Sequence, residues 1–221
     1  METGSFTMSA RPNFGAARPK ILSFVTPNAS ARIFAAQQAL FCAGDPADDL
    51  FELESGAVMV LRQLADGRRQ ILDIAGPCAL IGLAAGEVHD CSAIALRPTR
   101  ARRVSATSQS AQVQRAMFAE IQRLRDLVTA LGRKTAVERV AGFLVALAER
   151  GGPDPIALHL PVSRQEIGDH LGLAIETVCR NFKALERRGL IAIDGFFGVT
   201  IHDAEKLRQI AEGAEAPLPH A

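Results

Sequence analysis

The sequence lacks the features that mark several protein classes. Its 221 residues carry a formal net charge of +1, so overall charge favours neither nucleic acid nor membrane as a partner, and an electrostatic argument has to be local. No apolar run approaches the roughly 20 residues that a membrane helix needs. The N-terminal stretch has no continuous apolar core of the kind found in a secretory signal. We therefore expect a cytoplasmic protein with no membrane partner.

Cysteine is scarce, and its spacing excludes the common metal centres. The four cysteines form no C-x-x-C pair and match neither zinc nor iron–sulfur spacing, so we expect no metal and four free thiols. Three of them, Cys42, Cys78 and Cys91, are expected to be buried as small hydrophobic residues. The fourth, Cys179, stands in a different setting.

Catalytic motifs are missing as well. The sequence contains no nucleophile elbow and no glycine-rich phosphate loop. Ser163, Glu166, Asp169 and His170 lie close together, but a helix cap already explains the first two. We predict that the protein is not an enzyme.

The first half reads as short strands between glycines. Runs such as Val58-Met59-Val60-Leu61 alternate with turns, and Asp66-Gly67 between two such runs is a strong hairpin signal. This pattern predicts a small antiparallel barrel or roll over residues 29–108. Residues 1–28 are expected to form a flexible tail.

A long helix is expected over residues 109–133. Its apolar positions are spaced 4, 3, 4 and 3, which gives a two-heptad seam: Met117, Ile121, Leu124, Val128 and Leu131. Such a seam either packs on the protein's own core or joins two copies of the chain as a dimer interface. The sequence leaves both possibilities open.

Residues 134–215 have the order helix, helix, helix, hairpin, which is that of a winged helix–turn–helix. Ser163 followed three residues later by Glu166 predicts a capping box at the start of a helix, and Gly172 suits a left-handed stop at its end. The hairpin is expected around Asp194-Gly195.

The second helix of this motif has one apolar and one polar face. Val178, Phe182 and Leu185 are expected inside, whereas Glu176, Cys179, Arg180 and Lys183 project together on the other side. An arginine there can bond guanine O6 and N7, and a carboxylate can accept from cytosine N4. Phosphate contacts are predicted for Arg164, Gln165, Thr177 and Lys183. The plainer alternative is that Glu176 and Arg180 form only a surface ion pair.

The motif "SRQEIGDHLGL" followed by "ETVCR" resembles the helix–turn–helix of the Crp/Fnr superfamily of bacterial transcription regulators. The resemblance covers roughly residues 30–210. It implies an α+β fold: an antiparallel β-roll of the cyclic-nucleotide-binding kind, a long dimerisation helix and a C-terminal winged helix–turn–helix. It also implies a homodimer on double-stranded DNA, one helix per major groove about 34 Å apart, and activation through RNA polymerase.

Details of the recognition helix favour the Fnr/FixK-type branch. Ala174 stands where Crp-like proteins carry arginine, and it is followed by aliphatic Ile175 and then Glu176. The resemblance thus implies a TTGA-N6-TCAA type of palindrome, with base contacts from Ile175, Glu176, Cys179 and Arg180. Cysteine replaces the serine usual at position 179.

The sensor positions of the superfamily are altered. Leu83 stands where the ribose-binding carboxylate is expected, and Cys91 where the phosphate-binding arginine is expected. Losing both removes the charge-assisted bonds that offset desolvation of a cyclic phosphate. No cysteine precedes Cys42, which argues against an Fnr-type iron–sulfur cluster. His89-x-Cys91 could serve haem, but a surface loop is the favoured interpretation.

We therefore expect no cofactor, and a dimer that binds DNA without an effector. The alternative is an effector-gated, Crp-like regulator with a cyclic nucleotide or haem in its β-roll.

Two further features admit two interpretations each. Cys179 lies near a helix N-terminus beside Arg180, a setting that favours the thiolate, so oxidation could switch DNA binding off; alternatively it is merely a small residue facing the groove. The run "RPTRARR", residues 97–103, is either a solvated strand edge, which we favour, or a surface for an acidic partner such as RNA polymerase.

Overall fold

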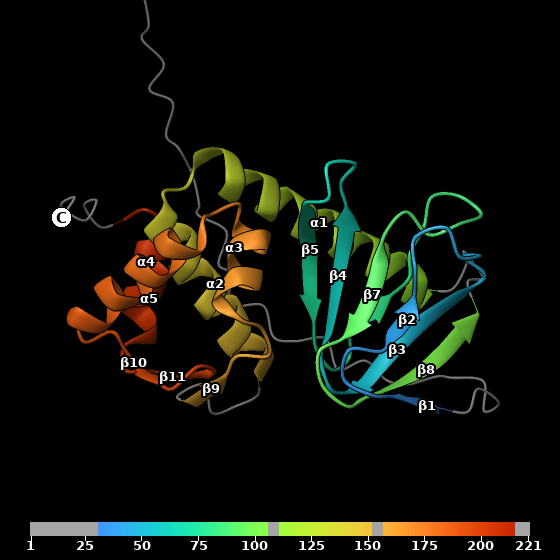
Figure 1. Cartoon of the computed structure of the whole chain (residues 1–221), viewed down its shortest axis with the longest axis horizontal. Helices are drawn as coiled ribbons and strands as arrows, with labels where there is room; N and C mark the ends of the chain where they lie inside the picture. Colours follow the sequence, from blue (N-terminus) through green and yellow to red (C-terminus); the bar gives the residue numbers. More distant parts are fainter. Residues whose placement is uncertain (1–30, 106–110, 152–156, 215–221) are drawn as a thin grey trace, which may run out of the picture.

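The computed structural model describes residues 31–105, 111–151 and 157–214 (Figure 1). The expected tail, residues 1–28, lies outside this range. The chain forms a β half and a helical half, and one long helix runs from one to the other (Figure 1). The predicted α+β class is confirmed.

The β half is a roll of two four-stranded antiparallel sheets, with strand orders β1-β8-β3-β6 and β2-β7-β4-β5. A turn with Gly67 at a φ of 86° joins β4 to β5, so the predicted hairpin is present. The strands are β1 (Ala31–Phe34), β2 (Ala39–Phe41), β3 (Asp49–Ser55), β4 (Val58–Gln63), β5 (Arg69–Ala75), β6 (Leu80–Ile81), β7 (Ser92–Ala95) and β8 (Thr99–Ser105).

The helical half begins with the long helix α1 (Ala111–Arg133). It continues with α2 (Ala136–Gly151), β9 (Ala157–His159), α3 (Arg164–Leu171), α4 (Ile175–Arg187), β10 (Ile191–Asp194), β11 (Gly198–Ile201) and α5 (Ala204–Ala211). The last three strands form one sheet in the order β10-β11-β9. Helix, helix, helix and hairpin therefore follow one another as predicted, and the motif is a winged helix–turn–helix.

Strand β4 is buried on both faces, which explains its uninterrupted apolar run. Val58 and Val60 point into the interior of the roll, whereas Met59 and Leu61 join the core of the helical half. Successive side chains of a strand point to opposite faces, so one strand serves two cores. The two halves are consequently packed together through a continuous apolar contact.

The arginine run on β8 is neutralised within the roll. Arg100 Nε lies 2.6 Å from Glu54, and Arg102 Nη2 lies 2.5 Å from Glu52, both across the β3–β8 pairing. Arg103 of β8 likewise pairs with Asp49 of β3. Opposite charges on paired strands stabilise the sheet, so these arginines already have acidic partners inside their own chain.

Two of the cysteines expected to be buried are exposed. Cys42 follows β2 directly after the buried Phe41 and therefore points outwards, with its amide bonded to Asp45. Cys78 sits in a turn with a φ of 68°, where its side chain faces solvent. Only Cys91 among the three is buried, because it lies in the apolar interior of the roll.

Candidate DNA-binding interface

Helix α3 begins and ends as the sequence predicts. Glu166 N–H donates to Ser163 Oγ at 3.3 Å, and Ser163 N–H donates to Glu166 Oε2 at 2.8 Å, which completes the capping box. At the other end Gly172 adopts a left-handed conformation with φ 63°. Helix α3 is therefore fixed at both ends before α4 starts at Ile175.

Gly168 permits the close approach of the turn to α3. A Cβ atom placed there would lie 2.5 Å from the carbonyl oxygen of Leu173, a backbone atom that cannot easily move aside. The tightest contact therefore comes from the turn that leads into α4.

We expect Gly168→Ala to lower the free energy of unfolding by about 1–3 kcal/mol, as overpacking does. For a chain of this size the melting temperature should fall by roughly 2–12 °C. Gly132→Ala is the matched control, because a Cβ there meets open space within α1, and alanine favours the helix. Thermal unfolding followed by circular dichroism measures both. A Gly168→Ala protein that melts no lower than wild type would contradict the expectation.

Helix α4 commits one face to the core and leaves the other free. Val178, Phe182 and Leu185 are buried, each 1% exposed or less. Glu176, Arg180 and Lys183 are exposed. None of these three side chains makes a hydrogen bond or ion pair within the part of the chain that the structure describes. The Glu176–Arg180 surface pair is therefore not formed, and both groups are available to an outside partner.

Cys179 lies between the buried and exposed faces of α4 and is half-buried. Its neighbour is Arg164 of α3, whose guanidinium stacks over the Phe182 ring at 3.7 Å from the ring centroid. Burial lowers the pKa of Arg164, and the Cys179 thiolate opposes that shift. A cation thus stands beside the thiol from a second helix, in addition to Arg180 on its own helix.

The residues predicted to contact phosphates are placed unequally. Lys183 is exposed and Thr177 is half-buried on α4. Gln165 donates its side-chain amide to Asp169 at 2.9 Å. One Nη atom of Arg164 is buried without a hydrogen-bond partner among the described residues. Phosphate contact by these four side chains stays a prediction.

The hairpin β10–β11 exposes two aromatic side chains that were not predicted from the sequence. Phe196 is 86% exposed and Phe197 42% exposed at its tip. The segment 189–201 contains neither lysine nor arginine. The wing therefore offers an aromatic rather than a cationic surface. The adjacent Phe-Phe pair after the Asp-Gly turn was the available signal.

The apolar seam of α1 is largely uncovered in the single chain. The exposed fractions are 48% for Met117, 43% for Ile121, 39% for Leu124 and 69% for Val128, whereas Leu131 is half-buried. Phe118, which lies beside the seam and was not singled out from the sequence, is 73% exposed. Packing on the protein's own core therefore does not account for this stripe, and a covering partner is required to bury it.

The loop that corresponds to the superfamily's phosphate site offers no free cation. Burial raises the pKa of Cys91 to about 11, so the thiol is neutral at pH 7. Arg62 nearby is bonded to the carbonyl oxygen and the carboxylate of Asp90. The residues present do not fit a cyclic nucleotide.

His89 lies in the loop between β6 and β7, but its side chain is buried rather than at the surface as expected. It is 3% exposed and stacks on Phe41 with 3.8 Å between ring centroids, and burial lowers its pKa. The described residues contain no group of three or more His, Cys, Asp or Glu placed to hold a metal ion. Of the helices in the described ranges, none has the length and apolar character needed to span a bilayer.

Comparison with known proteins defines the class. Residues 31–115 match the cyclic nucleotide-binding domain family, and residues 138–210 match the Crp-like helix-turn-helix domain family. The chain belongs to the Crp/Fnr family of transcription regulators. It is a DNA-binding regulator and not an enzyme.

Within this family the chain is similar to FixK proteins. It is 36% identical over 174 residues to the nitrogen fixation regulation protein FixK of Rhizobium meliloti, covering 77% of this chain and 82% of that one. The transcriptional activator anr of Pseudomonas aeruginosa is 35% identical over 189 residues, 79% of this chain and 77% of anr. The solved structure of FixK2 from Bradyrhizobium japonicum superposes with a TM-score of 0.75 at 31% identity, covering 86% of this chain and 99% of that one.

Proposed function

We propose that the protein is a transcription activator that binds a TTGA-N6-TCAA palindrome as a homodimer without a small-molecule effector. The observation that supports this proposal most directly is the free face of α4, where Glu176 and Arg180 are exposed and unpaired among the described residues. Arginine and glutamate presented in this way can read guanine and cytosine in the major groove. The uncovered α1 seam supports a second copy of the chain as the dimer partner.

Two further observations support the proposal. The altered phosphate site argues against a cyclic-nucleotide effector, since the neutral Cys91 thiol replaces a cation. A relative at 35% identity is named a transcriptional activator, and relatives at 34% and 36% identity are named nitrogen fixation regulation proteins. The first of these names supports activation through RNA polymerase. A regulator of bacterial promoters works in the cytosol.

The proposal includes Cys179 as the site of oxidative inactivation. Its thiolate attacks peroxide, an S–O bond forms as the O–O bond breaks, and the sulfur loses two electrons while peroxide is reduced to water. A second equivalent gives the sulfinate, which keeps a negative charge beside the DNA phosphates. Arg164 of α3 lies beside the thiol, and Arg180 is the next residue of α4.

Fluorescence anisotropy of a labelled TTGA-N6-TCAA duplex tests these claims together. Reduced protein without effector should bind with a Kd of about 10⁻⁸ M or below, far more tightly than a duplex with scrambled half-sites. Peroxide should raise the Kd at least tenfold, and Cys179→Ser should bind normally but resist peroxide. The Cys42→Ser/Cys78→Ser double variant is the control, since it removes the two other exposed thiols and should remain peroxide-sensitive.

Each part can fail separately. A Cys179→Ser protein that peroxide inactivates as strongly as wild type would exclude the switch but leave the regulator. If cyclic AMP raised the melting temperature and created selective binding that is absent without it, the effector-gated alternative would replace the proposal.

A further inference from the structure

The edge strand of the roll is bonded by three different helices. β5 pairs with β4 on one side only, so its outer backbone groups need other partners. The carbonyl oxygen of Ile71 lies 3.0 Å from His170 Nδ1 of α3. Arg123 of α1 donates to the carbonyl oxygen of Leu72, and Arg150 of α2 donates to that of Ile74, both at 2.5 Å. One strand thereby ties together α1, α2 and α3.

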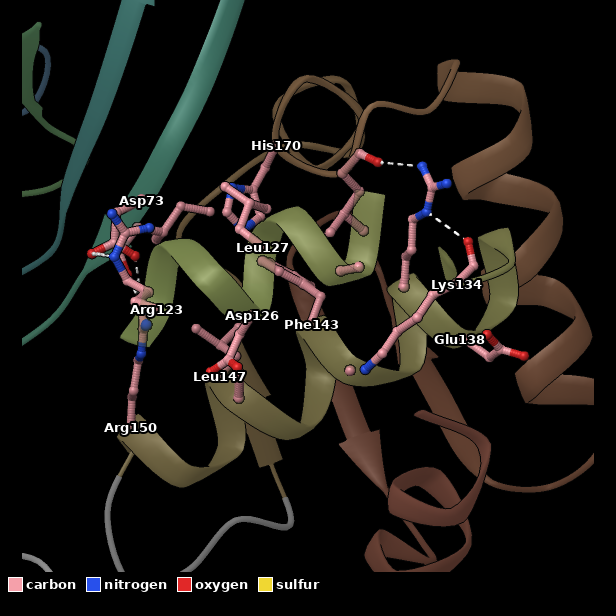
Figure 2. Close-up of a pocket in the computed structure, with 16 residues that line it drawn as sticks. Asp73, Arg123, Asp126, Leu127, Lys134, Glu138, Phe143, Leu147, Arg150 and His170 are labelled. Carbon is pink, nitrogen blue, oxygen red and sulfur yellow. Dashed lines mark hydrogen bonds and ion pairs between the residues drawn. The ribbon is translucent and has the colours of Figure 1, made fainter. Parts of the chain in front are cut away.

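Charged side chains strengthen the same junction. Arg69 Nε lies 2.7 Å from Asp169 Oδ2 and Arg69 Nη2 lies 3.9 Å from Glu166, which joins β5 to two residues one turn apart on α3. Asp73, only 16% exposed, lies between Arg123 at 3.6 Å and Arg150 at 3.2 Å (Figure 2). We call this set of contacts the β5 latch. It comprises the three edge carbonyls with Arg69 and Asp73 of β5, and their partners Arg123, Arg150, Asp169 and His170 on the helices.

Apolar residues of β4 and β5 also pack in the core of the helical half at this junction, but the packing is incomplete. A hollow of about 240 Å³ opens beside the latch, between β5 and helices α1, α2 and α3, with Phe143 and Leu127 among its lining residues (Figure 2). Incomplete packing leaves neighbouring elements room to shift. The directional bonds of the latch therefore act together with these apolar contacts to orient α3 against the roll.

We propose that the β5 latch positions the recognition helix for DNA in place of an effector. Helix α3 carries α4 through the tight Gly168–Leu173 contact and the stacking of Arg164 on Phe182. Fixing α3 against the roll therefore fixes α4 relative to α1. If α1 forms the dimer axis, the latch sets the separation of the two α4 helices, which must match one turn of DNA. This inference rests on the proposed function.

The effect of weakening the latch follows from population arithmetic. The apparent Kd rises as the fraction of protomers in the binding orientation falls, and both protomers of a dimer must be in place. If about one third of protomers keep that orientation, about one dimer in ten has both protomers in place. The affinity of the dimer for DNA then falls about tenfold.

Charge reversal across the Arg69–Asp169 pair is the test. Arg69→Glu and Asp169→Arg should each raise the Kd for the palindrome about tenfold at a temperature where both proteins are folded. The double variant, in which the pair is reversed, should return to within about threefold of wild type. Arg68→Glu is the matched control: it changes charge by the same amount one residue away, but among the described residues the Arg68 side chain pairs only with Asp66, at the surface.

A second measurement does not depend on DNA. Spin labels on Cys78 of the roll and on Lys206→Cys of α5, with the other cysteines replaced, report the distance between the two halves. The distribution should be narrow in the parent, broad in Arg69→Glu and narrow again in the reversed pair. Unchanged distributions would overturn the latch even if the palindrome were the wrong sequence. The latch would also be overturned if wild type bound the palindrome selectively and the single variants bound it equally well. A reversed pair that bound the palindrome no more tightly than the weaker single variant would overturn it too.

Discussion

Replacing Arg180 with alanine is expected to raise the Kd for the TTGA-N6-TCAA duplex by about 30-fold to 3 × 10⁴-fold. A bidentate arginine–guanine pair contributes roughly 1–3 kcal/mol of discrimination, and a dimer uses two of them, which gives about 2–6 kcal/mol. The guanidinium is exposed and has no partner among the described residues, so its removal breaks nothing inside the protein. Stability should stay within about 0.5 kcal/mol of wild type.

The informative measurement is discrimination rather than affinity alone. Wild type should lose affinity when the guanine of each half-site is changed to adenine, whereas Arg180→Ala should bind both duplexes equally. Lys183→Ala is the control on the same exposed face; it removes a predicted phosphate contact and should weaken all sequences alike. An Arg180→Ala protein that still prefers guanine at that position would show that another side chain reads it.

The local parts of this interface could be predicted from sequence because their causes are local. The capping box joins Ser163 to a residue three positions away, and the left-handed stop at Gly172 needs only the absence of a Cβ. The two faces of α4 follow from helical spacing. Each of these features is decided within a few residues of chain, where propensity and hydrogen bonding are strong signals.

The parts that could not be predicted depend on long-range contacts. Arg69 and Asp169 are 100 positions apart, and nothing in either neighbourhood points to the other. The stacking of Arg164 on Phe182 was missed because an arginine at a helix start is normally assumed to be solvated. The exposure of Cys42 and Cys78 depends on which way each turn directs its side chain, which composition does not encode.

Ile121→Glu is expected to convert the proposed dimer into a monomer. The exposed seam of Met117, Ile121, Leu124 and Val128, doubled across a two-fold axis, stabilises a dimer by on the order of 10 kcal/mol from apolar burial. Association costs about 4–15 kcal/mol in lost freedom, so the balance is narrow. Two carboxylates placed against each other within the seam should make association unfavourable, because both charges would be buried without a partner. Sedimentation should then give 23.6 kDa in place of twice that mass.

DNA binding should follow the oligomeric state. A monomer presents one α4 helix instead of two, so its affinity for the palindrome should fall by about 10³-fold, toward non-specific binding. Gln122→Glu is the matched control, because it adds the same charge one residue away on an exposed position outside the seam and should leave both mass and affinity unchanged. A monomeric Ile121→Glu protein that still bound the palindrome tightly would mean that a single recognition helix suffices. The two-fold symmetry of the site would then have no counterpart in the protein.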